Sequence, residues 1–451
     1  MHPAVAFRLG CIAFLFGVGA ASIGIGAGWI LIAAFPAVAI LIALHFSRRH
    51  KLLARKPESS RKFLVFAVIV SIAALGALYD TWHTARYKNT APPRYEALDM
   101  RGLIISNPYV AGGRQEFVVQ GKAPGHRYLV RGRMYPKVSY GDEVLIRGTV
   151  TYPETLGRRG NLMRRGVHGT LSFPAVQITA RGARVGVRGR LYAVRNAFRD
   201  ALIRILPSDE AALVNGVTLG GYGGLGADLV NAMRRSGTMH LVALSGYNVA
   251  IVASLVMTAC LALFGRRTAL AISIGIIALF VLMTGAEASV VRAAVMGFIG
   301  AAALNVGRTR DQSTAIAATA ALMVLANPKM LVFDAGFQLS FLALLGIVYV
   351  RPLVKRLSKF KNKGFLSWKE NLLTTVSAQL AVAPLLIAQF GAVPLAAVPA
   401  NLAVLWLIPG IMLMGFITAF VGIVAYPLAL PLGFLLHAPL AYVIATIQFF
   451  G

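Results

Sequence analysis

The segment MHLVALSGYNVAIVASLVMTACLALF, residues 239–264, is long and apolar enough to cross a lipid bilayer, for which a helix needs about 20 mostly apolar residues. Its first third nevertheless contains polar side chains and a glycine, namely His240, Ser245, Gly246, Tyr247 and Asn248. Polar groups are costly in hydrocarbon, so within membrane segments they face the interior of a helix bundle or a water-filled cavity. The segment therefore predicts a membrane-spanning helix bundle with a polar interior.

The composition of the whole chain is that of a protein that crosses the membrane several times. Of its 451 residues, 57% are hydrophobic and 14% are charged, proportions that are rare in soluble globular proteins. The first apolar stretch, residues 4–46, is too long for a cleavable signal peptide. From length and hydropathy we predict spans at residues 5–26, 28–46, 63–82, 240–264, 268–285, 289–306, 312–326, 332–350 and 371–390, with two or three more between 395 and 450.

Residues 84–190 have a different character from the rest of the chain. Hydropathy falls there, and short segments such as RQEFVVQG (114–121) and GDEVLIRGTVTY (141–152) alternate apolar with polar residues between Gly, Pro and Asn. Such alternation favours β-strands, and about a hundred residues of short strands suit a small barrel of the OB type. The predicted fold class is a polytopic α-helical membrane protein with an inserted extracytoplasmic small β-barrel.

A basic amphipathic helix is expected directly after the barrel, over residues 188–206. Its apolar residues recur at helical spacing, which suits a helix that lies on the membrane surface or docks on a neighbouring element. We therefore divide the chain into N-terminal transmembrane helices (1–83), the OB-like domain (84–190), the amphipathic and connecting helices (191–239) and a second transmembrane domain (240–451).

The charge of the chain is strongly positive, with 45 Lys and Arg against 16 Asp and Glu and a net charge of +29. Two explanations remain open: contact with anionic lipid through positive loops on the cytoplasmic side, or a polyanionic partner such as nucleic acid. If the barrel is outside, alternation of the spans places every short basic loop in the cytoplasm. These loops are residues 47–62, 265–268, 307–311 and 351–364.

Within the barrel, cationic and aromatic residues interleave along one stretch. In sequence-tolerant binding of single strands, cations follow the phosphates and flat rings stack on bases. We therefore expect DNA to be bound by Tyr128, Arg131, Arg133, Tyr135, Lys137 and Tyr140. The alternative is a solvated basic face that lies against anionic lipid headgroups.

Further polar residues interrupt the second transmembrane domain, and each could line a passage or serve the structure. Arg292 could reach the interface and pair with Glu287, and Asp334 could be a helix N-cap. Other polar groups could form interhelical hydrogen bonds, and His240 and Ser245–Gly246 could serve helix packing. The full set of channel-lining or structural polar residues is His240, Ser245, Gly246, Asn248, Glu287, Ser289, Arg292, Asp334, Gln338, Ser340 and Asn401.

The sequence gives little reason to expect an enzyme. Only Cys11 and Cys260 are available as thiols, and the eight histidines are scattered singly, so no metal site and no cofactor are predicted. An intramembrane enzyme built on Ser245 and His240 is disfavoured, because no base-orienting carboxylate is near them in sequence. We also find no nucleotide-binding glycine-rich loop.

These motifs together resemble the ComEC-type competence membrane proteins, a family of inner-membrane DNA-uptake channels. The resemblance covers nearly the whole chain. It rests on HLVALSGYNV (240–249), TGAEASVVRAAVM (284–296), DAGFQLSF (334–341) and PANL (399–402), in this order and spacing. Many members carry a histidine where this chain has Asn248. Larger members add a metallo-β-lactamase-like domain, whose ligand cluster does not occur here, so either strand degradation is expected in another polypeptide or the protein is used differently.

The resemblance implies that single-stranded DNA passes through the membrane bundle during natural transformation. It further implies a location in the inner (plasma) membrane, contact with an anionic bilayer, and as partners an outer DNA receptor and a cytoplasmic motor or strand-binding protein, with a possible homo-oligomer. The alternative function is a transporter or exporter of another anionic solute or envelope precursor. Such a protein would show inverted repeats with paired broken helices, and no convincing repeat is found.

Overall fold

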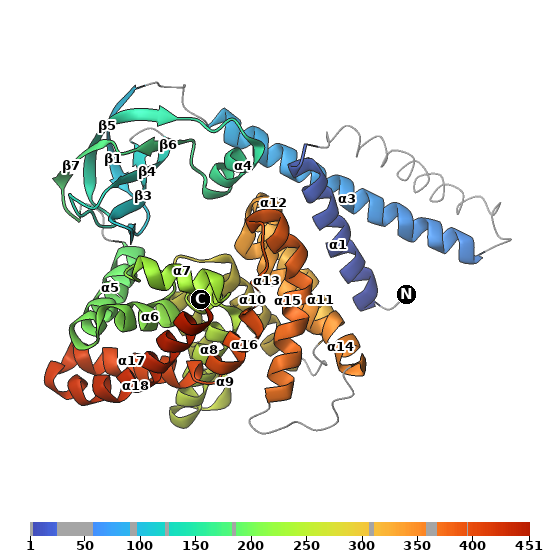
Figure 1. The fold of residues 1–451 in the computed structure, drawn as a ribbon. Helices are drawn as coiled ribbons and strands as arrows, with labels where there is room; N and C mark the ends of the chain where they lie inside the picture. The colour runs from blue at the N-terminus through green and yellow to red at the C-terminus, as the bar shows by residue number, and fades with distance from the viewer. Residues whose placement is uncertain are drawn as a thin grey trace.

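The computed structural model describes residues 3–24, 57–90, 97–121, 126–182, 186–305, 311–357, 368–394 and 396–451. The predicted span at 28–46 lies outside these residues. The described chain consists of two N-terminal helices, a small β-barrel and a larger helical bundle, and Figure 1 shows the barrel above one end of the bundle.

The first helix, α1 (Pro3–Ser22), packs along α3 (Pro57–Asn89) and also contacts the second half of the chain. Val18 belongs to a buried cluster with Ile316, Phe337 and Phe341. A second link is ionic: Lys329 Nζ lies 2.8 Å from Asp80 Oδ2, and the side chains are only 5% and 2% exposed. Ser22 Oγ donates a hydrogen bond of 2.9 Å to the other oxygen of Asp80. The N-terminal helices are therefore fixed to the bundle by apolar packing and a buried ion pair.

The barrel closes through five strands, and its topology is that of the OB type. The strands pair in the circular order β1–β3–β4–β6–β5–β1, and β4 runs parallel to β6 while the other pairs are antiparallel. Alternate residues fill the interior, among them Phe117, Tyr128 and Ile146. The elements are β1 (Ala97–Ile104), β2 (Tyr109–Ala111), β3 (Arg114–Gly121), β4 (Arg127–Arg133), β5 (Glu143–Thr151), α4 (Leu156–Arg165), β6 (Gly169–Ser172) and β7 (Ala175–Ala180).

The link from the barrel to the bundle is α5 (Val187–Ile205), the predicted amphipathic helix. It docks on α6 (Ser208–Leu219) and α17 (Ile408–Val424). The Phe198 ring meets Phe416 of α17 edge-on, with 5.4 Å between the ring centres. The part of α5 that contains Phe198 and Leu202 is therefore buried against neighbouring helices, while Val194 stays exposed. Docking on a neighbour is one of the two arrangements expected from the sequence.

The bundle contains most of the apolar helices. Among the residues that the structure describes, seven helices are long and apolar enough to cross a membrane, or up to eight if the bent pair α16–α17 counts as one span. The chain is thus a multi-pass membrane protein with an OB-like domain, as its sequence predicts. The remaining elements are α7 (Ala227–Arg235), η1 (Met239–Leu241), α8 (Gly246–Leu263), α9 (Arg266–Met283), α10 (Ala288–Asn305), α11 (Gln312–Ala326), α12 (Met330–Phe333), α13 (Ala335–Leu345), the π-helical η2 (Gly346–Val350), α14 (Arg351–Leu357), α15 (Trp368–Phe390), α16 (Ala397–Val404) and α18 (Tyr426–Phe450).

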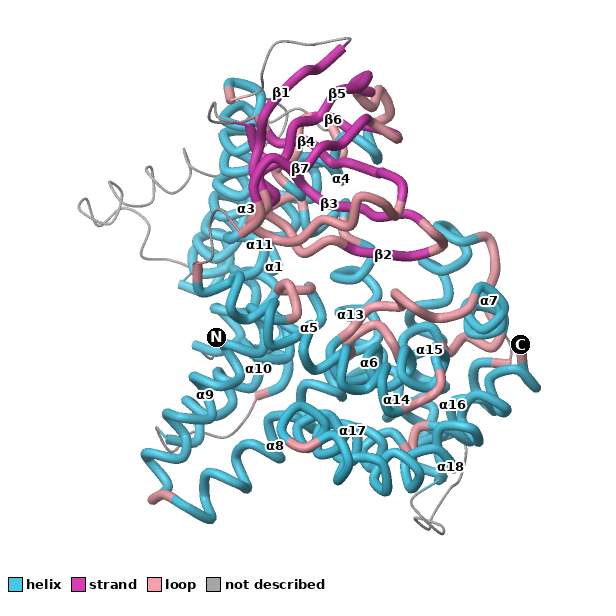
Figure 2. The backbone as a smooth tube through the Cα atoms, turned by 90° about the vertical axis from the view of Figure 1, so that its left-hand side faces the viewer, coloured by secondary structure: helices cyan, strands magenta, loops and turns pink. Residues whose placement is uncertain are grey.

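Barrel and bundle meet at two places. On one side α4 reaches from the barrel to α12, and on the other β2 and the β4–β5 link lie against the α5–α7 region (Figures 1 and 2). The ring of Tyr109 contacts Tyr222, with 5.3 Å between ring centres, and Tyr140 contacts Tyr192 at 5.2 Å. These contacts hold the barrel over the N-terminal ends of several bundle helices.

Candidate functional site

The polar residues in the segment 239–264 mark an interruption of the helix. Ser245 has an extended backbone, and its Oγ accepts a hydrogen bond from the amide of Asn248, so that it caps α8. The same hydroxyl donates to Asn248 Oδ1 at 3.1 Å, and Asn248 Nδ2 donates to the carbonyl of Val217 in α6 at 3.0 Å. A helix end leaves backbone groups without intrahelical partners. Ser245 and Asn248 satisfy such groups at the break.

Gly246 allows an arginine to lie against the start of α8. A Cβ at this position would lie 2.8 Å from Nη2 of Arg292, which comes from α10. Ser289, also on α10, donates a hydrogen bond to the carbonyl of Leu244. The guanidinium carbon of Arg292 lies 5.8 Å from the ring centre of Phe341 in α13. Arg292 therefore sits where α8, α10 and α13 meet.

The charge of Arg292 is not engaged by the neighbouring carboxylates. Its Nε is buried and has no hydrogen-bond partner among the residues described here. Glu287, one partner considered from the sequence, is attracted by Arg195 of α5 and repelled by Asp334. Glu287 is exposed in the link between α9 and α10. Among the described residues, no carboxylate forms an ion pair with this cation, which lies over the ring of Phe341.

A second interruption separates α12 from α13 at Asp334. One carboxylate oxygen accepts a hydrogen bond of 3.1 Å from the amide of Phe337 and caps α13. The other oxygen lies 2.8 Å from Nη1 of Arg164, which belongs to α4 of the barrel. Gln338 Nε2 donates to the carbonyls of Leu331 and Val332 at 3.0 and 2.8 Å. Asp334 therefore serves the helix break and the contact with the barrel at once.

The contact between α4 and this break is close. A Cβ on Gly160 would lie 2.4 Å from the ring of Phe333 in α12, so only a glycine fits in α4 here without a shift of the ring. Asn327 Nδ2 donates a hydrogen bond of 2.7 Å to the carbonyl of Arg164. Desolvation by burial lowers the pKa of Arg164, while the Asp334 charge opposes this effect. The pair fixes the barrel to the first turn of α13.

The remaining predicted residues of the membrane domain are more scattered. His240 is exposed, and its Nδ1 lies 3.1 Å from the carbonyl of Gly237. Ser340 is half-buried on α13. Asn401 is 5% exposed in α16, just before the bend of 52° that separates α16 from α17. Its Oδ1 is buried without a hydrogen-bond partner in the described part of the chain. Asn401 thus precedes a third helix interruption.

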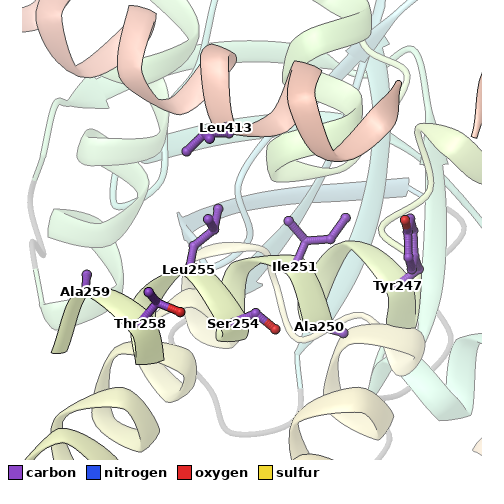
Figure 3. Close-up of a pocket in the computed structure, with 8 residues that line it drawn as sticks. All are labelled: Tyr247, Ala250, Ile251, Ser254, Leu255, Thr258, Ala259 and Leu413. Carbon is purple, nitrogen blue, oxygen red and sulfur yellow. The ribbon is translucent and has the colours of Figure 1, made fainter. Parts of the chain in front are cut away.

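We use the name mouth for the first turns of α8, α10 and α13, which contain Ser245–Asn248, Glu287–Arg292 and Asp334–Gln338. A groove of about 680 Å³ begins beside the mouth and runs along α8 toward its C-terminal end, with Leu413 of α17 on the opposite wall (Figure 3). Ser254 and Thr258 place hydroxyl groups along it, but Ile251 and Leu255 make most of its lining apolar. Such a surface suits hydrocarbon better than a polyanion.

On the barrel, the structure separates the six predicted DNA-binding residues into three groups. The side chains of Arg131, Arg133, Tyr135 and Lys137 are exposed. Tyr140 is half-buried against Tyr192. Tyr128 is 0% exposed in the barrel core. Because both faces of its ring are packed against the protein, neither face can stack on a base, and the stacking role predicted for Tyr128 is wrong.

Two features of the site were missed in the sequence. The Asp80–Lys329 pair was not anticipated, although an aspartate in the third span and a single lysine in an apolar segment were signals of buried charge. Helix α4 lies in a link that contains the glycines and arginines LGRRGNLMRR, where no helix was expected. Among the described residues, no group of three or more His, Cys, Asp or Glu side chains is arranged to hold a metal ion.

The fold and the site define a class of protein: a multi-pass membrane protein in which an OB-type barrel is fixed over a mouth of interrupted helices. Residues 217–451 match the family described as "Competence protein". This match covers more than half of the chain, and the chain belongs to that family.

One curated relative extends this comparison toward the N-terminus. The chain is 24% identical over 393 residues to ComE operon protein 3 of Bacillus subtilis (strain 168), an alignment that covers 83% of this chain and 48% of the relative. The chain therefore spans about half the length of this relative. The family membership expected from the four motifs is confirmed. No solved structure matches the chain.

Proposed function

We propose that this protein is an inner-membrane channel that passes single-stranded DNA into the cytoplasm during natural transformation, and that it acts without catalysing a reaction. The observation that carries the proposal is the mouth. Three helices begin there, on the side of the bundle that the barrel covers, and Arg292 lies between them with a buried Nε that no described residue engages.

The electrostatics of the mouth favour a strand of phosphates. Each helix N-terminus carries the positive end of the helix dipole, which attracts phosphate, although Ser245 and Asp334 already cap α8 and α13. Arg292 adds a full positive charge at the same junction. The mouth also contains two carboxylates. Asp334 is offset by Arg164 at 2.8 Å, and Glu287 is offset by its attraction to Arg195 of α5. A polyanion therefore meets a net positive potential on entering.

The barrel supports the same direction of transport. Its exposed Arg131, Arg133, Lys137 and Tyr135 provide cations and a ring for a strand of any sequence. We propose that an outer DNA receptor delivers the strand to the barrel and that a cytoplasmic motor or strand-binding protein draws it inward. We further propose that basic loops hold the protein on anionic lipid, and that homo-oligomers can form.

The test is DNA uptake in the host cell. The gene is deleted, and the deletion strain is complemented with the wild type, Arg292→Gln, Arg292→Lys or Arg356→Gln. Uptake of labelled DNA into the cytoplasm is then measured, with the amount of membrane-inserted protein determined by immunoblot. Arg356 is an exposed arginine of α14, away from the mouth, and serves as the matched control.

We expect deletion to abolish uptake and Arg292→Gln to lower it about 10- to 150-fold, the range that corresponds to a lost hydrogen bond to a charged group. Arg292→Lys should fall in between, and Arg356→Gln should match the wild type. Normal DNA uptake in the deletion strain would contradict the proposal and favour transport of another anionic solute. Equal effects of Arg292→Gln and Arg356→Gln would remove Arg292 from the passage.

A further inference from the structure

The outer face of β3 and β4 carries an unusual arrangement of charge. In the register of the two strands, Arg114 lies opposite Arg133, and Glu116 lies opposite Arg131. Two like charges directly opposite each other destabilise a sheet. These arginines are exposed, and the pair Arg114–Arg133 persists in a position where an anion would relieve its repulsion.

Helix α4 turns this flat face into a pocket. Leu162 of α4 packs with Leu129 of β4 and with Val118 and Val167, and so covers one end of the face. Beside this contact lies a pocket of about 470 Å³, in which Arg131 contributes from the sheet and Arg158, Asn161 and Arg165 contribute from α4. Hydroxyl groups of Thr151 and Thr170 complete its polar lining.

A single carboxylate holds two of the three arginines of this pocket. Glu116 accepts hydrogen bonds from Arg131 Nε at 3.0 Å and from Arg165 Nη1 at 2.8 Å. Burial acts to raise the pKa of Glu116, but the bonds from Arg165 and Arg131 outweigh it and the pKa is lowered. Glu116 is therefore ionised, and it competes with any bound anion for Arg131 and Arg165. Arg158 is exposed and adds a third guanidinium group beside this network.

An exposed aromatic ring lies at the other end of the same face. Phe173 follows β6, and its amide donates a hydrogen bond of 2.7 Å to the carbonyl of Arg131. Its φ is +52°, a left-handed conformation that is unfavourable for a residue with a Cβ. The side chain is 50% exposed, and the Arg114 guanidinium carbon lies 5.2 Å from the ring centre. A strained backbone that holds an apolar ring in solvent points to a function for the ring.

We propose that β3, β4, β6 and α4 form a clamp for single-stranded DNA, in which Arg131, Arg158 and Arg165 hold a phosphodiester group and Phe173 stacks on a nearby base. The clamp deepens the proposed function and rests on it, because it assumes that DNA reaches the barrel. Its position favours a strand on its way to the mouth: Arg165 lines the pocket, while the adjacent Arg164 contacts Asp334 at the first turn of α13.

The clamp is tested by binding of a fluorescently labelled oligothymidine to the full chain in nanodiscs of zwitterionic lipid, across a series of salt concentrations. The variants are Phe173→Gly, Arg158→Gln with Arg165→Gln, and Glu116→Gln. Arg101→Gln is the matched control, since Arg101 is an exposed arginine on β1, outside the clamp. Thermal unfolding of each variant shows that it is folded.

Phe173→Gly should weaken binding about 5- to 150-fold, as expected for the loss of one stacked base, and should raise the unfolding temperature because glycine accepts a positive φ. The double arginine variant should flatten the salt dependence by about 0.7 per lost contact. Glu116→Gln is the most discriminating change. If Glu116 competes with DNA for the arginines, Glu116→Gln should raise the affinity for oligothymidine. If its ion pairs are only structural, the substitution should destabilise the protein without raising this affinity.

Three results would overturn the clamp. The first is that the wild type does not bind oligothymidine. The second is that Phe173→Gly and the double arginine variant bind it with the same affinity as Arg101→Gln, and the third is that Glu116→Gln binds it more weakly than the wild type. Loss of binding to anionic vesicles but not to oligothymidine in these variants would assign the face to lipid. The uptake assay in cells is independent of this measurement. Loss of uptake on deletion together with an intact oligothymidine affinity in all variants would remove the clamp and leave the channel in place.

Discussion

The mouth and the barrel face both collect polar residues, but they use them in opposite ways. In the mouth, Ser245, Asn248 and Asp334 are bound to backbone groups that the helix breaks leave open. On the barrel face, the side chain of Arg131 remains 59% exposed even in its ion pair. This difference predicts which property of the protein a substitution in each region changes. Changes in the mouth affect stability and function together, whereas changes on the barrel face affect binding with little loss of stability.

The largest effect should come from the buried ion pair between Asp80 of α3 and Lys329. Removal of one partner leaves an uncompensated buried charge, which costs about 3–5 kcal/mol. We therefore expect Lys329→Met to lower the free energy of unfolding of the detergent-solubilised protein by about that amount. The exposed pair Arg147–Asp99, with side chains 66% and 57% exposed, is the control, and Arg147→Gln should cost about 0–1 kcal/mol. Equal costs would contradict the distinction between buried and exposed ion pairs.

How far the sequence predicts the site depends on whether a signal is local. Ser245, Asn248 and Asp334 were found because each is a polar residue within an apolar segment, and helix caps act over three residues. The Asp80–Lys329 pair joins residues 249 positions apart, and neither charge identifies its partner. The general fold was predictable because apolar length and strand alternation are strong patterns.

The barrel shows why a pattern can be correct and its assignment wrong. In β4, Tyr128, Leu129 and Val130 are all buried, because α4 covers the outer face at Leu129. Alternation therefore does not reveal which side of this strand is the interior, and Tyr128 was placed on the wrong face. Phe173 was missed for a related reason: a left-handed φ is not expected for phenylalanine.

The second prediction separates the two roles of Asp334. Asp334→Asn removes the ion pair with Arg164 but retains an N-cap, since asparagine caps as well as aspartate does. A hydrogen bond between charged groups contributes about 1.5–3 kcal/mol, so we expect a loss of that size. Asp334→Ala should cost about 1 kcal/mol more, the value of the cap. The free energy of unfolding is measured for both variants. Equal losses of stability would show that the helix cap contributes nothing.

The third prediction concerns Asn248, whose side chain joins the start of α8 to α6. Asn248→Ala removes the hydrogen bond to the Val217 carbonyl and leaves that buried group unsatisfied. The expected cost is about 1–3 kcal/mol, again measured by unfolding. Ser254→Ala is the control within the same helix, because Ser254 is exposed in the groove. A neutral Asn248→Ala would mean that the mouth does not depend on its internal hydrogen bonds.

The smallest effect compares two tyrosines of the barrel that the sequence treats alike. Tyr135 is 73% exposed, whereas Tyr140 packs edge-on against Tyr192 of α5. An aromatic pair of this kind contributes about 0.5–1.5 kcal/mol beyond the area it buries. Tyr140→Ala should therefore destabilise the protein by at least that amount, and Tyr135→Ala should remain within about 0.5 kcal/mol of the wild type, as exposed substitutions usually do.

Binding of oligothymidine should show the reverse order, because only the Tyr135 ring offers a free face to a base. If Tyr140→Ala weakens DNA binding more than Tyr135→Ala at equal stability, the Tyr140 ring must leave Tyr192 and contact DNA. The barrel would then separate from α5 when it binds DNA, and the same residue would serve both the contact with α5 and the contact with DNA.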